Sequence, residues 1–244
     1  MEMKLENIKI NDWEFSTELS SDSIIGITGP EYEELLEILR LETLPEGNIT
    51  MNETVVTPEN HLDYYKTISI IEKEFHKINY LNTIKEHMDY IINYYHLQIK
   101  NIEKKEKDSL KIVGLDESLL DRNITTLSRS EKKKVELAIG LLSNPDIIIL
   151  DDPFRFLDNK SRKRMIMVLR KLKEQFHKLI IIGTLDEEIL YQYTDRMLFV
   201  KNKRIFLETA TEEGYERVDY LKRNGFQVPE RVLFTYKAIK KKKV

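Results

Sequence analysis

The stretch that decides the fold runs from Leu127 to Asp158 and reads LSRSEKKKVELAIGLLSNPDIIILDDPFRFLD. Its first half has apolar residues at helical spacing, which predicts a helix over residues 128–142 with one buried face. The run Ile147 to Leu150 is short, continuous and rich in β-branched residues, as in a parallel strand covered on both faces. A second helix follows, which Asp158 can cap, and then a second buried run over 179–183. This strand, helix, strand order predicts a right-handed crossover in a parallel sheet, and therefore an α/β fold.

The same kind of pattern continues on both sides of this stretch. Residues 13–19 alternate apolar and polar side chains, as in a half-buried strand. Ile24 to Thr28 is a short apolar run that leads into Gly29-Pro30, and a helix is expected from Glu33 to Leu41. The remaining segments predict strands over 47–56, 67–71, 197–200 and 204–206, a helical region over 83–120, and helices after 206.

The composition excludes several classes of protein. The net charge of −3 argues against a general nucleic-acid binder. Cysteine is absent, so disulfides and thiolate chemistry are ruled out, which fits a reducing cytoplasm. The apolar runs are far shorter than the ~18 residues that span a bilayer, and we see no signal peptide. The basic tail Lys240 to Lys243 is expected to be solvated; the alternative is attraction to an anionic membrane surface, at about 1 kcal/mol per lysine.

The order of motifs resembles that of the ATP-binding cassette (ABC) ATPases. In that family a signature segment, a helix, a Walker B strand ending in Asp-Glu-Pro, and a D-loop ending in Leu-Asp follow one another, as residues 127–135, 147–153 and 157–158 do here. The resemblance implies a P-loop NTPase fold of the ABC type: a RecA-like parallel sheet core with antiparallel β and α-helical subdomains and a C-terminal helical extension. It places an ABC nucleotide-binding domain over 1–210, its helical subdomain at about 75–145, and the extension, with its lysine-rich tail, over 211–244.

The C-terminal part adds a narrower resemblance. Residues Tyr220 to Tyr236, with Gly225 and Val228-Pro229-Glu230, are similar to the C-terminal extension of energy-coupling factor ATPases. Those proteins are the cytoplasmic motor subunits of bacterial vitamin and metal-ion importers.

The segment after Gly29-Pro30 departs from the phosphate loop (Walker A) that the resemblance implies. Such a loop needs glycine N–H groups around the phosphates, a lysine for the β- and γ-phosphates, and a Ser or Thr hydroxyl for magnesium. No lysine, serine or threonine occurs between Pro30 and Glu42. Aligned without a gap, the lysine and serine positions fall on residues 35 and 36, both leucine. Aligned on the apolar pattern that follows, the loop is about three residues short and these positions fall on Tyr32 and Glu33.

Glutamates occupy the place where a triphosphate would lie. Glu31, Glu33 and Glu34 each repel a phosphate charge by roughly 1 kcal/mol in water, and by ~4 kcal/mol at an effective dielectric of about 20. We therefore do not expect tight ATP binding by this loop.

Four further positions take their roles from the resemblance. Asp151 is where the family holds magnesium through water, and it is the metal ligand here if Mg²⁺ binds at all. Asp152 stands at the catalytic glutamate position, but it is one methylene shorter and would reach the attacking water poorly. Leu185 aligns with the switch histidine and cannot donate to a γ-phosphate, and Lys73 aligns with the Q-loop glutamine. We expect Asp151 and Asp152 to be structural remnants.

In this family the signature contacts the nucleotide bound by the opposite subunit of a dimer. Here Arg129 and Ser130 replace its two glycines, and Ser128 with Glu131 makes a capping box. Three interpretations stay open: Arg129 blocks close approach, Arg129 supplies a positive charge to a partner's γ-phosphate, or the segment is a capped helix only. Trp13 is expected in the core or on a sheet face rather than stacked on adenine.

These observations lead to three hypotheses. The first is a catalytically degenerate ABC transporter ATP-binding subunit of an energy-coupling factor importer, which lies in the cytoplasm on the inner face of the membrane. It would pair with a competent cassette through its signature and the D-loop residue Asp158, and dock on a membrane component through residues 83–121. It would bind ATP and Mg²⁺ weakly or only through the partner subunit. The second is an active, atypical ATPase that uses Asp151, Asp152 and either Arg40 or Lys73. The third is a stand-alone scaffold or regulatory protein. None includes nucleic acid as a partner, and the transported substrate is not indicated.

Overall fold

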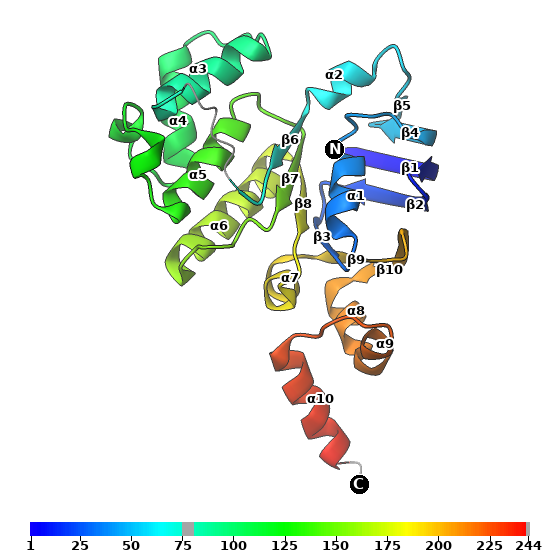
Figure 1. Cartoon of the computed structure of the whole chain (residues 1–244). Coiled ribbons are helices and arrows are strands. Elements are labelled where there is room, and N and C mark those ends of the chain that lie inside the picture. Colours follow the sequence, from blue (N-terminus) through cyan, green and yellow to red (C-terminus); the bar gives the residue numbers. More distant parts are fainter. Residues whose placement is uncertain (75–80, 243–244) are drawn as a thin grey trace.

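The computed structural model describes residues 1–74 and 81–242, and these residues form two β-sheets covered by helices (Figure 1). The larger sheet has six strands in the order β10-β9-β3-β8-β7-β6. Five of them run parallel, and β10 pairs antiparallel with β9 at one edge. Their bounds are β3 (Ile24–Thr28), β6 (Ile68–Ile71), β7 (Ile147–Asp151), β8 (Leu179–Gly183), β9 (Arg196–Lys201) and β10 (Arg204–Ala210).

Each face of the larger sheet has its own hydrophobic core. Ile148 and Leu150 of β7 pack into the core shared with the helices of the second half of the chain. Ile147 and Ile149 of the same strand face the opposite side, toward the smaller sheet. All four are at most 1% exposed. Because both faces are covered, the strand reads as an uninterrupted apolar run in the sequence.

The smaller sheet is antiparallel, with the order β2-β1-β4-β5. It consists of β1 (Glu2–Ile10), β2 (Trp13–Ser20), β4 (Glu46–Met51) and β5 (Thr54–Val55), and α1 (Tyr32–Leu39) packs in the core between the two sheets. Trp13 lies in this core, 1% exposed, and its indole N–H donates to Glu34 Oε2 at 3.1 Å. The prediction of a core tryptophan is confirmed, because a buried indole offers no face to adenine.

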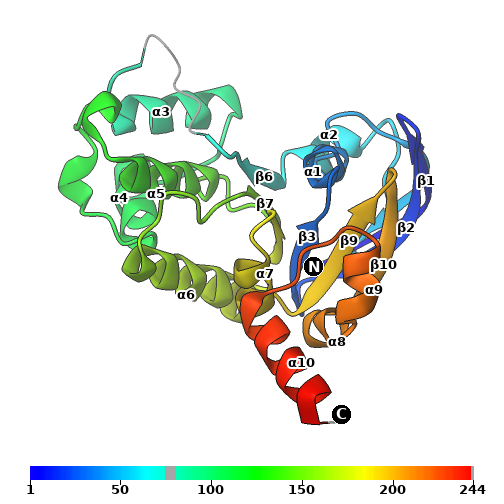
Figure 2. The same ribbon diagram turned by 60° about the horizontal axis from the view of Figure 1, so that its bottom comes forward.

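The helices form separate groups around the sheets (Figures 1 and 2). The first group, α3 (Ile84–Tyr94), α4 (Ile102–Ile112) and α5 (Arg129–Gly140), lies beside the edge strand β6, and α6 (Asn159–Phe176) packs on β8. Two short helices are α2 (His61–Tyr65) and α7 (Glu187–Tyr193). After β10 come α8 (Thr211–Glu216), α9 (Val218–Arg223) and α10 (Glu230–Lys242), and α10 extends away from the sheets in both views. Within residues 1–74 and 81–242, no helix combines the length and apolar character needed to cross a membrane.

The elements predicted from periodicity are present, with local differences. The strand expected over 47–56 is divided by a turn in which Asn52 and Glu53 both have positive φ. The helices α2 and α7 and the strand β1 were not predicted individually. Asp158 caps α6 as expected, since its carboxylate accepts from Ser161 N at 2.6 Å. The proposed start of the helical subdomain at about 75 and the last lysine of the tail, Lys243, lie outside the described residues.

The turn after β3 provides a stability test. Gly29 has φ +124°, and a Cβ added there would lie 2.0 Å from the backbone oxygen of Val200 in β9. Gly29→Ala should therefore lower the free energy of unfolding by more than about 3 kcal/mol, through both backbone strain and a clash with main chain. Gly225→Ala is the matched control: its φ is +85°, but a Cβ there meets no atom within 4 Å. It should cost only the left-handed strain of about 1–2 kcal/mol. Urea denaturation measures both, and equal losses would contradict this account of the turn.

Candidate functional site

The carboxyl ends of β3, β8 and β7 lie side by side, because these strands are parallel neighbours in the larger sheet. This edge is where open α/β sheets bind ligands. The chain leaves the strands here through Gly29 after β3, Asp152 after β7 and Thr184 after β8. We refer to this edge, residues 28–34, 73, 151–152 and 184–187, as the strand-end site.

The turn between β3 and α1 contains only the residues from Gly29 to Glu31. Pro30 has no N–H, and Tyr32 N donates to Gly29 O at 3.2 Å, so neither of these residues offers a backbone donor to a ligand. Leu35 and Leu36 are 0% and 1% exposed and belong to the core. The alignment without a gap thus puts the lysine and serine positions in the core, and the alignment with a shortened loop puts them on Tyr32 and Glu33 at the strand-end site.

Tyr32 fills the space above β8. Its hydroxyl lies 3.0 Å from Asp151 Oδ1 and 3.2 Å from Glu33 Oε1 and donates to these carboxylates. Its ring is so close to the sheet that a Cβ added at Gly183 would lie 2.8 Å from ring atom Cδ2. The side chain is 3% exposed, and burial, together with the carboxylate of Asp151, raises its pKa far above its ordinary value of 10.0. Burial also raises the pKa of Asp151, and the hydrogen bond from Tyr32 opposes that rise.

Lys73 reaches the same site from the segment after β6. Its Nζ donates to Glu33 Oε1 at 2.8 Å, and this hydrogen bond lowers the pKa of Glu33 and raises that of Lys73. The carboxylates of Asp151 and Asp152 add to the rise in the pKa of Lys73. The residue at the Q-loop position therefore lies at the site, with its charge directed to Glu33.

The other predicted residues are placed as follows. Asp152 has φ 44°, and its Oδ1 accepts from Thr184 Oγ1 at 2.9 Å, so its carboxylate turns toward β8. Leu185 is 56% exposed. Arg40 follows the last residue of α1 and lies about 12 Å along the helix from Tyr32, at ~1.5 Å per residue. The structure thus does not bring Arg40 to Asp151, which removes it as a substitute in the ATPase hypothesis.

The signature segment forms the N-terminus of α5. Ser128 Oγ accepts from Glu131 N, and the carboxylate of Glu131 accepts from Ser128 N at 2.8 Å, so the predicted capping box is present. Arg129 and Ser130 are the first two residues of the helix. The guanidinium of Arg129 lies over the ring of Phe156, 4.6 Å from its centroid. Phe156 was not singled out in the sequence, because only the tertiary fold brings it beside the signature.

The family model described as ABC transporter matches residues 15–155. The chain belongs to the ABC transporter family. It is an ATP-binding subunit of that family, for which ATP and Mg²⁺ are the implied ligands, and it has the α/β ABC ATPase fold that the motif order predicted.

The known proteins most similar to this ABC subunit include one curated relative and two solved structures. It is 25% identical over 240 residues, 96% of this chain and 81% of the relative, to the energy-coupling factor transporter ATP-binding protein EcfA2 of Enterococcus faecalis. Its fold matches cbiO1 from Clostridium perfringens, described as part of the ABC transporter complex cbiONQ, with a TM-score of 0.76, 20% identity, and coverage of 96% and 98% of the two chains. It also matches a dimeric ATP-binding cassette bound to ADP and Pi, with a TM-score of 0.72, 21% identity, and coverage of 86% and 98%.

One carboxyl group of the strand-end site of this ABC subunit is buried. Glu187 of α7 is 7% exposed; Thr28 Oγ1 donates to its Oε1 at 3.0 Å, and the Tyr215 hydroxyl donates to its Oε2. Burial raises the pKa of Glu187 to about 7. The group links the end of β3 to α7 and α8. Sequence reasoning missed it, because nothing local distinguishes a buried glutamate in a short helix from an exposed one.

Glu187 predicts a pH dependence of stability. Its pKa is about 7 in the folded chain and 4.5 ordinarily, so folding favours the protonated carboxyl group. The resulting contribution to the free energy of unfolding is fully present below pH 4.5. This contribution is lost as the pH rises from 4.5 to 7. Glu187→Gln, which imitates the protonated form, should match the wild type near pH 4. At pH 8 it should be more stable, on the order of 3 kcal/mol. Urea denaturation across this pH range measures it, with Glu212→Gln on the surface of α8 as control. Parallel curves for the wild type and Glu187→Gln would contradict the assignment.

Proposed function

We propose that this chain is a catalytically degenerate ATP-binding subunit of an energy-coupling factor importer, and that it acts with a competent second cassette and a membrane component. The observation that carries the degeneracy is the contact between Tyr32 and Asp151. The importer type is supported by relatives named as energy-coupling factor transporter ATP-binding proteins in Enterococcus faecalis and other bacteria. The alignment with the first of these extends over the C-terminal helices, since it covers 96% of the chain.

The residues of the strand-end site do not fit Mg²⁺-ATP. The Tyr32 ring and hydroxyl lie directly against Asp151, and the turn before Tyr32 is too short to surround a phosphate with N–H groups. Glu31 Oε2 is buried without a hydrogen-bond partner, so the turn contains an unsatisfied acceptor where a phosphate would need donors. Displacing Tyr32 would also expose an aromatic side chain, at about 2 kcal/mol, before any phosphate contact forms.

The residues present do not form a metal site either. Within residues 1–74 and 81–242, no group of three or more His, Asp or Glu side chains is arranged to hold a metal ion. Asp151 is one carboxylate, and Tyr32 already donates to it. Mg²⁺ needs substrate phosphates as additional ligands when a protein offers only one or two carboxylates. We therefore assign no magnesium-dependent step to this chain alone.

The rival hypothesis of an active atypical ATPase is disfavoured by the same contacts. Lys73 is paired with Glu33, and the carboxylate of Asp152 is turned to Thr184. A general base must lie within hydrogen-bond reach of the water it activates, and Asp152 is held away from that role by Thr184.

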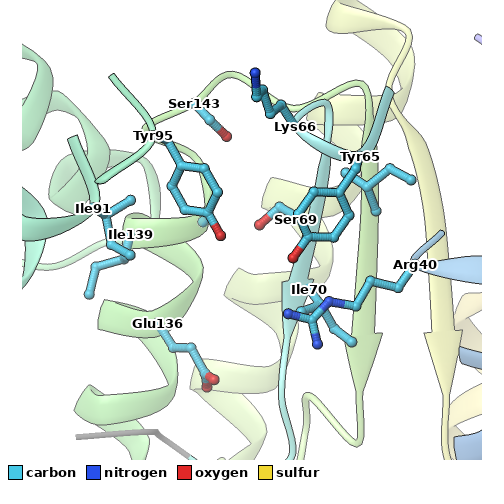
Figure 3. A pocket seen from close by; sticks show the side chains of 12 residues that line it. Arg40, Tyr65, Lys66, Ser69, Ile70, Ile91, Tyr95, Glu136, Ile139 and Ser143 are labelled. Atoms are coloured by element: carbon cyan, nitrogen blue, oxygen red, sulfur yellow. The ribbon is translucent and has the colours of Figure 1, made fainter. Parts of the chain in front are cut away.

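A cavity beside β6 is the place where we propose that the membrane component docks. It has a volume of about 150 Å³ and lies between the core, which contributes Arg40 and Tyr65, and the helical group, which contributes Tyr95 and Glu136 (Figure 3). The tyrosine hydroxyls and the guanidinium of Arg40 point into it. Burial raises the pKa of Glu136 to about 7. Tyr95 belongs to the region 83–121 that the sequence suggested for docking, so we propose that the membrane component inserts a side chain here.

Nucleotide binding tests the degeneracy. The purified full-length chain, titrated with a fluorescent ATP analogue and Mg²⁺, should show no saturable binding up to millimolar concentration, because the strand-end site is filled by Tyr32. A competent ABC cassette under the same conditions serves as positive control. Saturable binding that Asp151→Asn abolishes would overturn the proposal that this chain holds no nucleotide by itself.

Docking at the cavity is tested by capture from native membranes in mild detergent. The wild-type chain should bring a second cassette and an integral-membrane protein, and Tyr95→Ala should reduce the membrane protein by at least about tenfold, as loss of a buried aromatic contact at an interface does. Tyr94→Ala is the matched control, since Tyr94 is 63% exposed and does not line the cavity. Equal capture by the two variants would refute the docking site, and recovery of a lone chain would refute the transporter assignment.

A further inference from the structure

The last helix, α10, is held on the molecule differently from the other long helices. The side chains of α10 that the structure describes are all exposed or half-buried, whereas α3, α4, α5 and α6 each bury several residues. Val232, Leu233 and Tyr236 pack against the core shared with the other helices, while Phe234 and Ile239 are 79% and 51% exposed. Hydrophobic burial therefore contributes less to the docking of α10 than to that of the other long helices.

The first turn of α10 is fastened to α7 by Arg231. Its Nε donates to Glu188 Oε2 at 2.8 Å, its Nη2 donates to Gln192 Oε1 at 3.5 Å, and its guanidinium lies 5.7 Å from the centroid of the Tyr191 ring. Residues three and four apart share one face of a helix, so this arginine covers one face of α7. The backbone N–H of Arg231 also donates to Glu188 Oε1 at 3.4 Å, which places a carboxylate at the N-terminus of α10.

The segment before α10 is anchored independently of this contact. Phe226 and Val228, between α9 and α10, are 6% and 7% exposed and belong to the core. Farther along α10, Tyr236 and Lys240 donate to Asp219 of α9, a contact that lies within the C-terminal helices. Separation of α10 from α7 would therefore leave the preceding segment in place.

Neighbouring residues hold α7 on two sides. On the inner side, Glu187 is 7% exposed and accepts from Thr28 and Tyr215. On the outer side, the ion pair of Glu188 with Arg231 joins side chains that are 38% and 50% exposed. Solvent and salt weaken a half-exposed ion pair much more than a buried contact. The outer attachment of α7 is therefore the one that opens first.

We propose that α10 is a releasable strap, which Arg231 fastens to the outer face of α7, and that its release loosens α7 beyond Glu188. The start of α7 stays in position through Glu187, next to the strand-end site. A helix that is docked by a half-exposed ion pair and little apolar burial belongs to the low-stability end of a fold, from which moving elements are drawn. The strap and α7 form one coupled unit, because the same contact restrains both.

The first experiment measures amide hydrogen exchange in the full-length chain by mass spectrometry. Arg231→Gln should accelerate exchange about tenfold or more in α10 and over residues 190–193 of α7, since both lose their restraint. Exchange in β7 and β8 should stay unchanged, which shows that the fold is intact. Arg217→Gln is the matched control, because Arg217 is exposed and its side chain has no ion pair among the described residues. Faster exchange in α10 with none in α7 would overturn the proposal.

The same contact can be broken from the other side. Glu188→Gln lies in α7, yet it should accelerate exchange in α10, because coupling between two elements acts in both directions. Glu212→Gln, an exposed carboxylate of α8, should have no such effect. Unchanged exchange of α10 in Glu188→Gln would show that α10 is held without α7 and would overturn the proposal.

Salt provides a test in the wild type. Raising NaCl from about 0.1 M to about 1 M shortens the Debye length from about 10 Å to about 3 Å and should accelerate exchange in α10 and α7. In Arg231→Gln, which lacks the ion pair, the acceleration should be much smaller. An equal response of the two proteins would overturn the ion pair as the attachment of the strap.

Discussion

The hydrogen bond from the Tyr32 hydroxyl to Asp151 Oδ1, 3.0 Å long, joins the first turn of α1 to the end of β7 across the strand-end site. It is possible only because the chain passes from β3 to α1 in a turn of three residues, which starts the helix directly above the sheet. A longer loop would move Tyr32 away from Asp151 and leave a half-buried carboxylate without its donor, which is costly. The length of the turn, the position of α1 and the hydrogen bonding of Asp151 therefore depend on one another.

The same edge of the sheet holds its other acidic groups by similar means. Lys73 neutralises Glu33, Thr184 donates to Asp152, and Thr28 and Tyr215 donate to Glu187. Each donor comes from a different segment, so these carboxylates connect α1 to the segment after β6, the end of β7 to that of β8, and α7 to β3 and α8. Among these carboxylates Glu187 is buried, and a buried polar group whose hydrogen bonds are all made by the protein rigidifies its surroundings.

Periodicity and motif order were enough to predict the parallel sheet and the capped helices, because Ile147 to Leu150 and the Ser128–Glu131 box carry local signals. They left two alignments open after β3, and only the structure shows that Leu35 and Leu36 lie in the core while Tyr32 reaches Asp151. Glu187 and Phe156 could not be found, because their surroundings come from segments distant in sequence. The structure gives the positions and contacts of the predicted site residues, and their roles stay predictions.

The strand-end site and the surface beside the signature differ in how their charged side chains are paired. At the strand-end site the carboxylates of Glu33, Asp151, Asp152 and Glu187 accept hydrogen bonds from other side chains. Glu31 Oε2 has no hydrogen-bond partner. Beside the signature, the guanidinium groups of Arg129 and Arg155 both lie over the ring of Phe156, although like charges repel. A fold gains stability when opposite charges are close, so a cationic group kept uncompensated reflects a demand other than folding.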